Sequence, residues 1–235
     1  LIAHDLGANG DAIAALERVL EIARADMDGH IVQRELIQLS GTTPDDRPVL
    51  GMFLGGAGLA DSILYCRHKL YPLGLPNWLA HVLTLVATLV AMISGIRARF
   101  LPPRPQPIKI SVMKSGVLQG RFALLLVTTL QRLLLEAHMP GGTGSNASAT
   151  APIGAMQLIV IERRPWALIR ALVAAIRGRL GRRRLAGVHL ERGDEIRIEG
   201  DRSNVILDGE SFEARFDRPI VLRPTPPVAF LRLAA

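Results

Sequence analysis

The chain has 235 residues, of which 49% are hydrophobic; this is enough for a sizeable core and excludes a disordered protein. The net charge of +7 comes almost entirely from arginine, the single cysteine, Cys66, excludes an internal disulfide, and aromatic residues at 4% are too few for a nucleic-acid stacking surface. We therefore expect a globular, cytoplasmic protein whose basic charge reflects either solubility or an acidic partner such as phospholipid or nucleotide, but not nucleic acid.

A helix and a strand come first along the chain. Residues 11–25 carry apolar side chains at helical spacing behind Asp11, a good N-cap, and predict an amphipathic helix that needs a partner surface for its apolar stripe. After Asp28 and Gly29 the pattern becomes that of a strand over residues 30–39, followed by a loop over 40–47. This change of pattern predicts a domain boundary near Asp28.

Glycines separate the next strand from the next helix. A strand over residues 49–54 leads into Gly-Gly-Ala-Gly at 55–58, and a helix follows over 59–70. The order is similar to a dinucleotide-binding turn, but Asp61 occupies the place of the third glycine, and the lysine of a Walker loop is missing. We therefore expect these glycines to allow a close strand-to-helix turn.

Residues 79–96 form an apolar run of about the minimum length that spans a bilayer. His81, Thr84 and Thr88 lie at helical spacing and give the run a narrow polar stripe. We expect a buried or interfacial helix that turns this stripe to the surface and buries its other faces; a transmembrane span is the alternative. A stiff, proline-rich connector over 102–107 then ends the helical region.

Strands dominate beyond the connector, at residues 108–113, 122–128 and 157–161, with a short helix over 130–137 and a polar loop over 140–152 between the last two. A second convincing helix begins at Pro165, and its spacing predicts that Leu168, Leu172 and Ile176 share one face.

A basic patch accompanies this second helix. It is either a solvated face or a contact for anionic lipid headgroups, and its members are Arg170, Arg177, Arg182, Arg183 and Arg184. The second alternative predicts a peripheral protein at the inner face of the membrane.

Two alternating runs near the end, 195–199 and 204–207, lead into Asp208-Gly209-Glu210, and further strands follow at 213–216 and 220–222. Asp-Gly between strands is typical of a type I′ hairpin turn, which needs positive φ at both central residues. Glu210 stands just beyond this turn on a rigid strand pair, where a general base could be held in register.

Other kinds of site find little support. The six histidines are scattered, and none pairs with a cysteine or carboxylate at metal-ligand spacing, so we expect no protein metal site. There is no Gly-x-Ser-x-Gly elbow, and no motif supports Cys66 as a nucleophile.

Four segments in this order resemble the downstream part of the diacylglycerol kinase-like lipid kinases, a bacterial family that includes relatives of sphingosine kinases. They are residues 1–7, 51–58, 122–129 and the Asp208-Gly209-Glu210 triplet. The resemblance implies an α+β fold: residues 29–235 form an antiparallel β-sandwich-like domain with several helices, and residues 1–28 are the remnant helix of an upstream α/β nucleotide-binding domain. The last strand could return to that upstream domain, which is missing here.

The same resemblance implies a kinase that transfers the γ-phosphate of ATP to the hydroxyl of diacylglycerol or a similar lipid alcohol. Glu210 would be the base, Asp208 would support nucleotide-bound Mg²⁺ or orientation, and Gly209 would lie at the nucleotide site. The family's nucleotide loop is missing, and residues 140–156 lack the carboxylates that many relatives carry there. We therefore expect this fragment alone to be inactive; the alternatives are a non-catalytic, pseudokinase-like lipid-binding module and an integral membrane protein.

Overall fold

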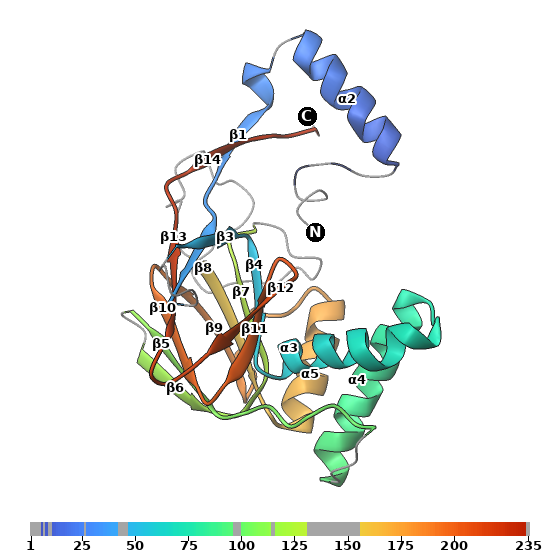
Figure 1. The fold of residues 1–235 in the computed structure, drawn as a ribbon, viewed down its shortest axis with the longest axis vertical. Coiled ribbons are helices and arrows are strands. Elements are labelled where there is room, and N and C mark those ends of the chain that lie inside the picture. The colour runs from blue at the N-terminus through green and yellow to red at the C-terminus, as the bar shows by residue number, and fades with distance from the viewer. Residues whose placement is uncertain are drawn as a thin grey trace.

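The computed structural model shows an α+β protein, as expected: two stacked antiparallel sheets, a layer of helices against one of them, and a small separate sheet at one end (Figure 1). It describes residues 6, 8, 11–25, 27–41, 47–95, 100–113, 116–130 and 156–233. The predicted helix over 130–137, the loop over 140–152 and the segment 1–7 lie largely or wholly outside these residues.

Each sheet of the sandwich has six antiparallel strands. The first runs in the order β3 (Val49–Gly51), β2 (Ile37–Ser40), β13 (Ile220–Pro224), β10 (Ile196–Gly200), β5 (Ile108–Val112) and β6 (Gly116–Gly120). The second runs in the order β12 (Glu210–Ala214), β11 (Ser203–Leu207), β4 (Phe53–Gly56), β7 (Phe122–Thr128), β8 (Met156–Glu162) and β9 (Val188–Gly193).

The main core lies between the two sheets. Strand β5 alternates buried and half-buried residues, as expected for a strand with one face on a core. Fully buried aliphatic side chains from both sheets meet there, among them Ile37, Leu39, Leu54, Ile110, Leu125, Leu158, Ile196, Ile198 and Leu222. Their removal from water supplies the main driving force for folding.

Helices cover the outer face of the second sheet. Helix α3 (Gly58–Tyr65) packs on β4 and β7, and α5 (Pro165–Ile176) packs on β8, where its alanines form a second apolar cluster with strand residues. A π-helical turn (Cys66–Leu70) and a 3-10 turn (Tyr71–Leu73) lead from α3 into α4 (Asn77–Ser94). Helix α4 packs against α3, the π-helical turn and α5, and lies at the edge of the molecule (Figure 1).

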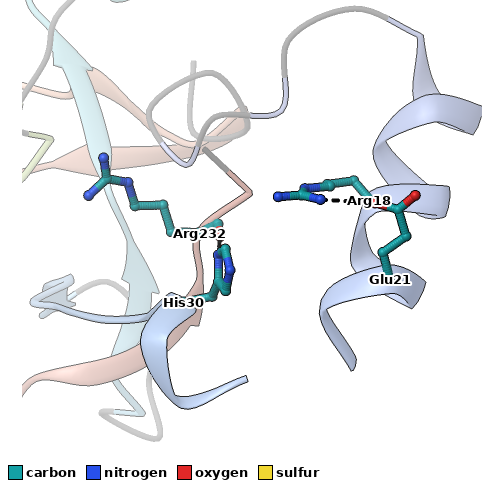
Figure 2. A network of polar contacts seen from close by, with 4 residues as sticks. All are labelled: Arg18, Glu21, His30 and Arg232. Atoms are coloured by element: carbon teal, nitrogen blue, oxygen red, sulfur yellow. Dashed lines mark hydrogen bonds and ion pairs between the residues drawn. The ribbon is translucent and has the colours of Figure 1, made fainter. Parts of the chain in front are cut away.

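A third, two-stranded sheet stands apart from the sandwich. It joins β1 (Ile31–Arg34) to β14 (Val228–Leu231), and Arg232 donates its backbone N–H to the carbonyl of His30 at 2.8 Å. The carbonyl of Arg232 accepts a hydrogen bond from Nδ1 of His30 at 3.1 Å (Figure 2). A 3-10 turn (Asp28–His30) precedes this sheet, and α2 (Ala12–Arg24), the predicted first helix, lies beyond it.

Helix α2 carries an ion pair along one side and its apolar residues on the surface. Arg18 and Glu21 pair at 2.9 Å, one helical turn apart (Figure 2). Ile13, Leu16 and Leu20 are exposed, and Ile22 is the one buried residue in the helix. The amphipathic helix is thus confirmed, and within the described part of the chain its apolar stripe is uncovered.

Two predicted strands are each divided in the structure. The strand expected over 30–39 breaks at Leu36: β1 leaves for the separate sheet and β2 joins the sandwich. Leu36 and Thr225 mark the branch point. The N–H of Leu36 donates to Thr225 Oγ1, and the N–H of Thr225 donates to the carbonyl of Leu36. The strand expected over 49–54 breaks at Met52 into β3 and β4, which lie in different sheets. Strands β6, β9 and β14 were not predicted.

The predicted orientation of α4 is wrong. Thr84 and Ala80 are buried against the neighbouring helices, whereas Trp78 and Ile93 are each 68% exposed. Small side chains allow α4 to approach α3 closely, and the Thr84 and Thr88 hydroxyls are satisfied within the helix by the carbonyls four residues earlier. Among the described helices, α4 alone is long and apolar enough to cross a membrane.

The predicted inner face of α5 also needs correction. The sheet contacts Ala167, Ala171 and Ala175, and Ile176 is 71% exposed. The reason is the same as in α4, because alanines let the helix backbone approach the bulky strand residues Ile159 and Ile161.

Candidate functional site

The Asp208-Gly209 turn joins β11 to β12 in a two-residue hairpin. Leu207 pairs with Glu210 across it, and φ is 45° at Asp208 and 103° at Gly209. Positive φ at both central residues is the type I′ geometry expected from the sequence. The turn therefore projects the first residue of β12, Glu210, from a regular strand pair.

The Asp208 carboxylate ties this turn to the neighbouring strand. Its Oδ2 accepts the N–H of Met52 at 2.8 Å and its Oδ1 accepts the N–H of Phe53 at 3.1 Å, while the Asp208 N–H bonds to the carbonyl of Phe53 at 3.0 Å. Gly51 makes room, because a Cβ there would come within 2.7 Å of Asp208 Oδ2. Three hydrogen bonds thus fix the orientation of the turn.

Met52 is held from its other side by the end of β7. Its carbonyl accepts the buried Thr128 hydroxyl at 3.0 Å and the N–H of Thr129 at 3.2 Å, and the Thr128 Oγ1 also accepts the N–H of Leu130. The break between β3 and β4 is therefore a junction that connects β7 to the hairpin turn.

Arg67 links the turn to the helical layer. It lies in the π-helical turn after α3, and its Nη1 donates to the carbonyl of Gly209 at 3.2 Å. Neither Arg67 nor the Met52–Thr128 junction stands out in the sequence, because these contacts join residues far apart in the chain and no local motif marks them.

Glu210 is exposed and begins an edge strand of its sheet. Within the described ranges its carboxylate has no hydrogen-bond or ion-pair partner, whereas each oxygen of Asp208 accepts one backbone N–H. The hairpin tip lies at the end of the sandwich from which β1 and β14 extend (Figure 1). The arrangement therefore presents one free carboxylate, on a fixed strand, at an accessible edge.

A further carboxyl belongs to α3, on the side that faces the sheet. Asp61 Oδ1 accepts a hydrogen bond from Nδ2 of Asn204 on β11 at 3.2 Å. Burial raises the pKa of Asp61 above its usual range, and the hydrogen bond from Asn204 opposes this rise. Asp61 thus links α3 to β11, the strand next to β4, at a point away from the hairpin turn.

The arginines gather elsewhere. Arg170 and Arg177 are exposed on α5, and Arg182, Arg183 and Arg184 are exposed in the turn that follows it. A hollow of about 380 Å³ at the opposite end of β7 from the hairpin is lined by Arg121, Arg163 and Arg164. Burial, with the nearby charges of Arg104 and Arg121, lowers the pKa of Arg163. The arginine-rich surface is therefore separate from the hairpin turn that carries Asp208 and Glu210.

In the part of the chain that the structure describes, no group of three or more His, Cys, Asp or Glu side chains could hold a metal ion. The two carboxylates of the turn differ in availability, because both Asp208 oxygens already accept backbone N–H groups.

Comparisons with known proteins place the fold. No protein-family model matches the chain. No curated protein matches it either. Among solved structures, a crystal structure of a "putative diacylglycerol kinase" from Bacillus anthracis str. Sterne matches with a TM-score of 0.54 and 15% identity, over 95% of this chain and 61% of that one. A second structure described in the same words matches with a TM-score of 0.51 and 15% identity, over 95% of this chain and 62% of that one.

The chain therefore spans about 61% of the length of the first of these proteins and shares its fold in that part. The described segments that carry the resemblance in the sequence, 51–58, 122–129 and 208–210, belong to β4, β7 and the β11–β12 turn, which are neighbours in one sheet. They meet at the hydrogen bonds around Met52.

Proposed function

We propose that this chain forms the sandwich domain of an ATP-dependent lipid kinase that phosphorylates diacylglycerol or a similar lipid alcohol. The observation that carries the proposal is the fixed turn: Asp208 bonds to the backbone of Met52 and Phe53, while Glu210 is exposed and has no partner among the described residues. The shared fold with the two Bacillus anthracis structures supports it, and their description as diacylglycerol kinases suggests the substrate class.

In the proposed reaction, Glu210 removes the proton from the lipid hydroxyl as that oxygen attacks the γ-phosphorus of ATP. The new P–O bond forms on the lipid, the bond between the γ-phosphorus and the bridging oxygen breaks, and ADP leaves. Phosphoryl transfer needs mainly positioning and charge neutralisation, so a fixed carboxylate base is a suitable contribution from this domain. The proposal includes a further region of the protein, which would bind the nucleotide.

Mg²⁺ would arrive with the nucleotide and neutralise phosphate charge, and Mg²⁺ in such sites is usually held by one or two carboxylates, water and substrate phosphates. Of the two roles expected for Asp208, the geometry favours orientation, because its oxygens are engaged by Met52 and Phe53. We propose that Gly209, whose carbonyl accepts from Arg67, lies beside the nucleotide.

The test is ATP-dependent lipid phosphorylation by the full-length gene product, including whatever sequence precedes Leu1. Glu210→Gln keeps the size of the side chain but removes the base, and should lower kcat by about 10²- to 10⁴-fold. Glu213→Gln is the matched control on the same strand, because that carboxylate is paired with Arg215 Nε at 2.6 Å. Equal turnover in wild type and Glu210→Gln would remove Glu210 as the base.

The same assay separates a second candidate, a non-catalytic lipid-binding module. The observation that favours it is the lack of any Asp or Glu between residues 140 and 156. Lipid binding by the full-length protein without ATP turnover would support this candidate. Measurable lipid phosphorylation would exclude it.

A further inference from the structure

Helix α4 presents a continuous apolar surface that no described residue covers. Large side chains on one side of the helix are 40% to 68% exposed, and they are Trp78, Val82, Leu83, Val86, Val90 and Ile93. The opposite side carries Ala80, Thr84 and Ala91, which are buried. Small residues thus form the packed side of the helix, and the large apolar residues named leave 40% to 68% of their surface exposed.

The chain segments that carry and flank this surface contain basic residues but no acidic ones. No Asp or Glu occurs between Asp61 and Glu136, or between Glu162 and Glu191, and these two stretches contain α4, its flanking turns and α5. Basic side chains surround α4: Arg67 and Lys69 precede it, Arg104 and Arg163 lie by its C-terminal part, and Arg170 and Arg177 are exposed on α5. Such a region attracts an anionic surface.

Helix α5, which lies beside α4, also exposes apolar and basic side chains together. Trp166, Arg170, Val173 and Arg177 lie three or four residues apart, and all four are exposed. Apolar and basic side chains thus alternate along one line of the helix surface. Trp, Val, Ile and Leu beside arginines and lysines make up the typical surface of helices that lie in the membrane interface.

We propose that α4 lies in the plane of an anionic lipid bilayer, inserts its apolar side chains into the headgroup and acyl boundary, and is held there by the arginines around it and on α5. At 1.5 Å per residue the helix offers about 27 Å of contact. A second copy of the chain is the less suitable occupant, because a symmetric dimer would bring two basic surfaces together.

A short segment of the chain connects α4 to the Asp208-Gly209 turn. Arg67 begins the short connection from the helical layer to α4, and it holds the carbonyl of Gly209. The inference does not depend on the proposed function, since membrane binding needs no nucleotide and no base.

The first experiment measures partition of the 235-residue chain onto vesicles of phosphatidylcholine with phosphatidylglycerol. Val86→Glu places a charge at the centre of the apolar surface and should weaken binding by roughly thirty-fold. Val117→Glu is the matched control, because Val117 is similarly exposed and lies on β6, the edge strand of the sheet that the helices do not cover. Unchanged binding of Val86→Glu, or an equal loss in Val117→Glu, would overturn the proposal.

The second experiment follows Trp78 directly. The chain has two tryptophans, so Trp166→Phe leaves Trp78 as the single fluorophore. Its emission should shift to shorter wavelength on anionic vesicles, with quenching by lipids brominated near the headgroup and little quenching near the bilayer centre. Quenching at the centre together with resistance to carbonate extraction would indicate a span instead, and an unchanged emission would indicate no insertion; either result overturns the proposal.

The third experiment separates charge from apolar contact. Arg170→Gln with Arg177→Gln should reduce binding to anionic vesicles by about five-fold for each charge, and the loss should disappear at high salt. A dimer in solution that Val86→Glu dissociates, without vesicle binding by wild type, would assign the surface to a second copy and overturn the proposal. Glu210→Gln should bind vesicles as wild type does, so a failed kinase assay and a failed vesicle assay are distinguishable.

Discussion

In the sandwich interior the large apolar side chains point inward and are removed from water, whereas α4 turns a row of large apolar side chains outward and buries small ones such as Ala80 and Ala91. Strand residues such as Ile110 and Leu125 are completely buried, while Val86 and Ile93 of α4 are exposed. The interior therefore accounts for stability. The outer side of α4 is apolar without contributing to the core, and its composition is better explained by contact with something outside the chain.

Removal of one core side chain should produce the largest effect on stability. Leu125→Ala deletes a completely buried side chain that packs against Gly56, and should lower the free energy of unfolding by about 2–5 kcal/mol. Val82→Ala on α4 is the comparison, and it should change stability by less than about 0.5 kcal/mol. Urea denaturation of the two variants measures the difference. Equal losses would show that the outer side of α4 is buried in solution.

The inner side of α4 should respond to added volume. Ala80 is completely buried, so Ala80→Leu overpacks the inner side of the helix and should cost about 1–3 kcal/mol. Val86→Leu adds a single methylene on the exposed side and should be nearly neutral. The midpoints of thermal unfolding test this pair. If Ala80→Leu were neutral and Val86→Leu costly, the helix would be rotated relative to its position in the structure.

The sequence predicts many of these elements because their signals are local. Helices α2, α4 and α5 follow from apolar spacing and from Pro165 at a helix start, and the hairpin follows from Asp208-Gly209. The α+β class and the resemblance to diacylglycerol kinase-like structures are also confirmed at the level of fold. What fails is orientation: the threonine stripe of α4 predicts a polar surface, but Thr84 satisfies its hydroxyl on the carbonyl of Ala80 and can face inward.

Long-range contacts account for the rest. The strand over residues 30–39 divides because Leu36 and Thr225 bond to each other across a branch between two sheets, and nothing local marks that point. The position of Glu210 beyond a tight turn follows from the sequence. The hydrogen bonds that fix this turn do not follow from the sequence, because Met52, Thr128 and Arg67 come from three separate segments. The roles of Glu210, Asp208 and Gly209 remain predictions that the kinase assay tests.

Asp61 lies at the contact between the two regions, on α3 but bonded to Asn204 of the sandwich. Burial raises its pKa above 3.8 in the folded chain, so folding retains a proton that the unfolded chain releases, and stability falls as the pH rises through this range. Asp61→Asn keeps an oxygen that can accept the hydrogen bond from Asn204. Because the amide does not ionise, the loss of stability with rising pH should disappear. The variant should be as stable as wild type or slightly more stable at pH 7.

The comparison of the two chains across pH checks this prediction. Unfolding free energies of wild type and Asp61→Asn should converge as the pH falls below about 4, where Asp61 is protonated in both states. A variant that is less stable than wild type at pH 7, with a gap that grows with pH, would mean that the ionised carboxylate stabilises the contact of α3 with β11.

The smallest effect on stability is expected for Val90→Ser, on the outer side of α4. Valine and serine have similar helix propensities, and Val90 is about half exposed, so the free energy of unfolding should change by less than about 0.5 kcal/mol. A serine there can satisfy its hydroxyl on the carbonyl of Val86, as Ser94 does on that of Val90. A loss above about 1.5 kcal/mol would mean that this side packs against protein. Near-zero change in stability together with weaker vesicle binding would separate the two uses of apolar residues, folding in the sandwich and membrane contact on α4.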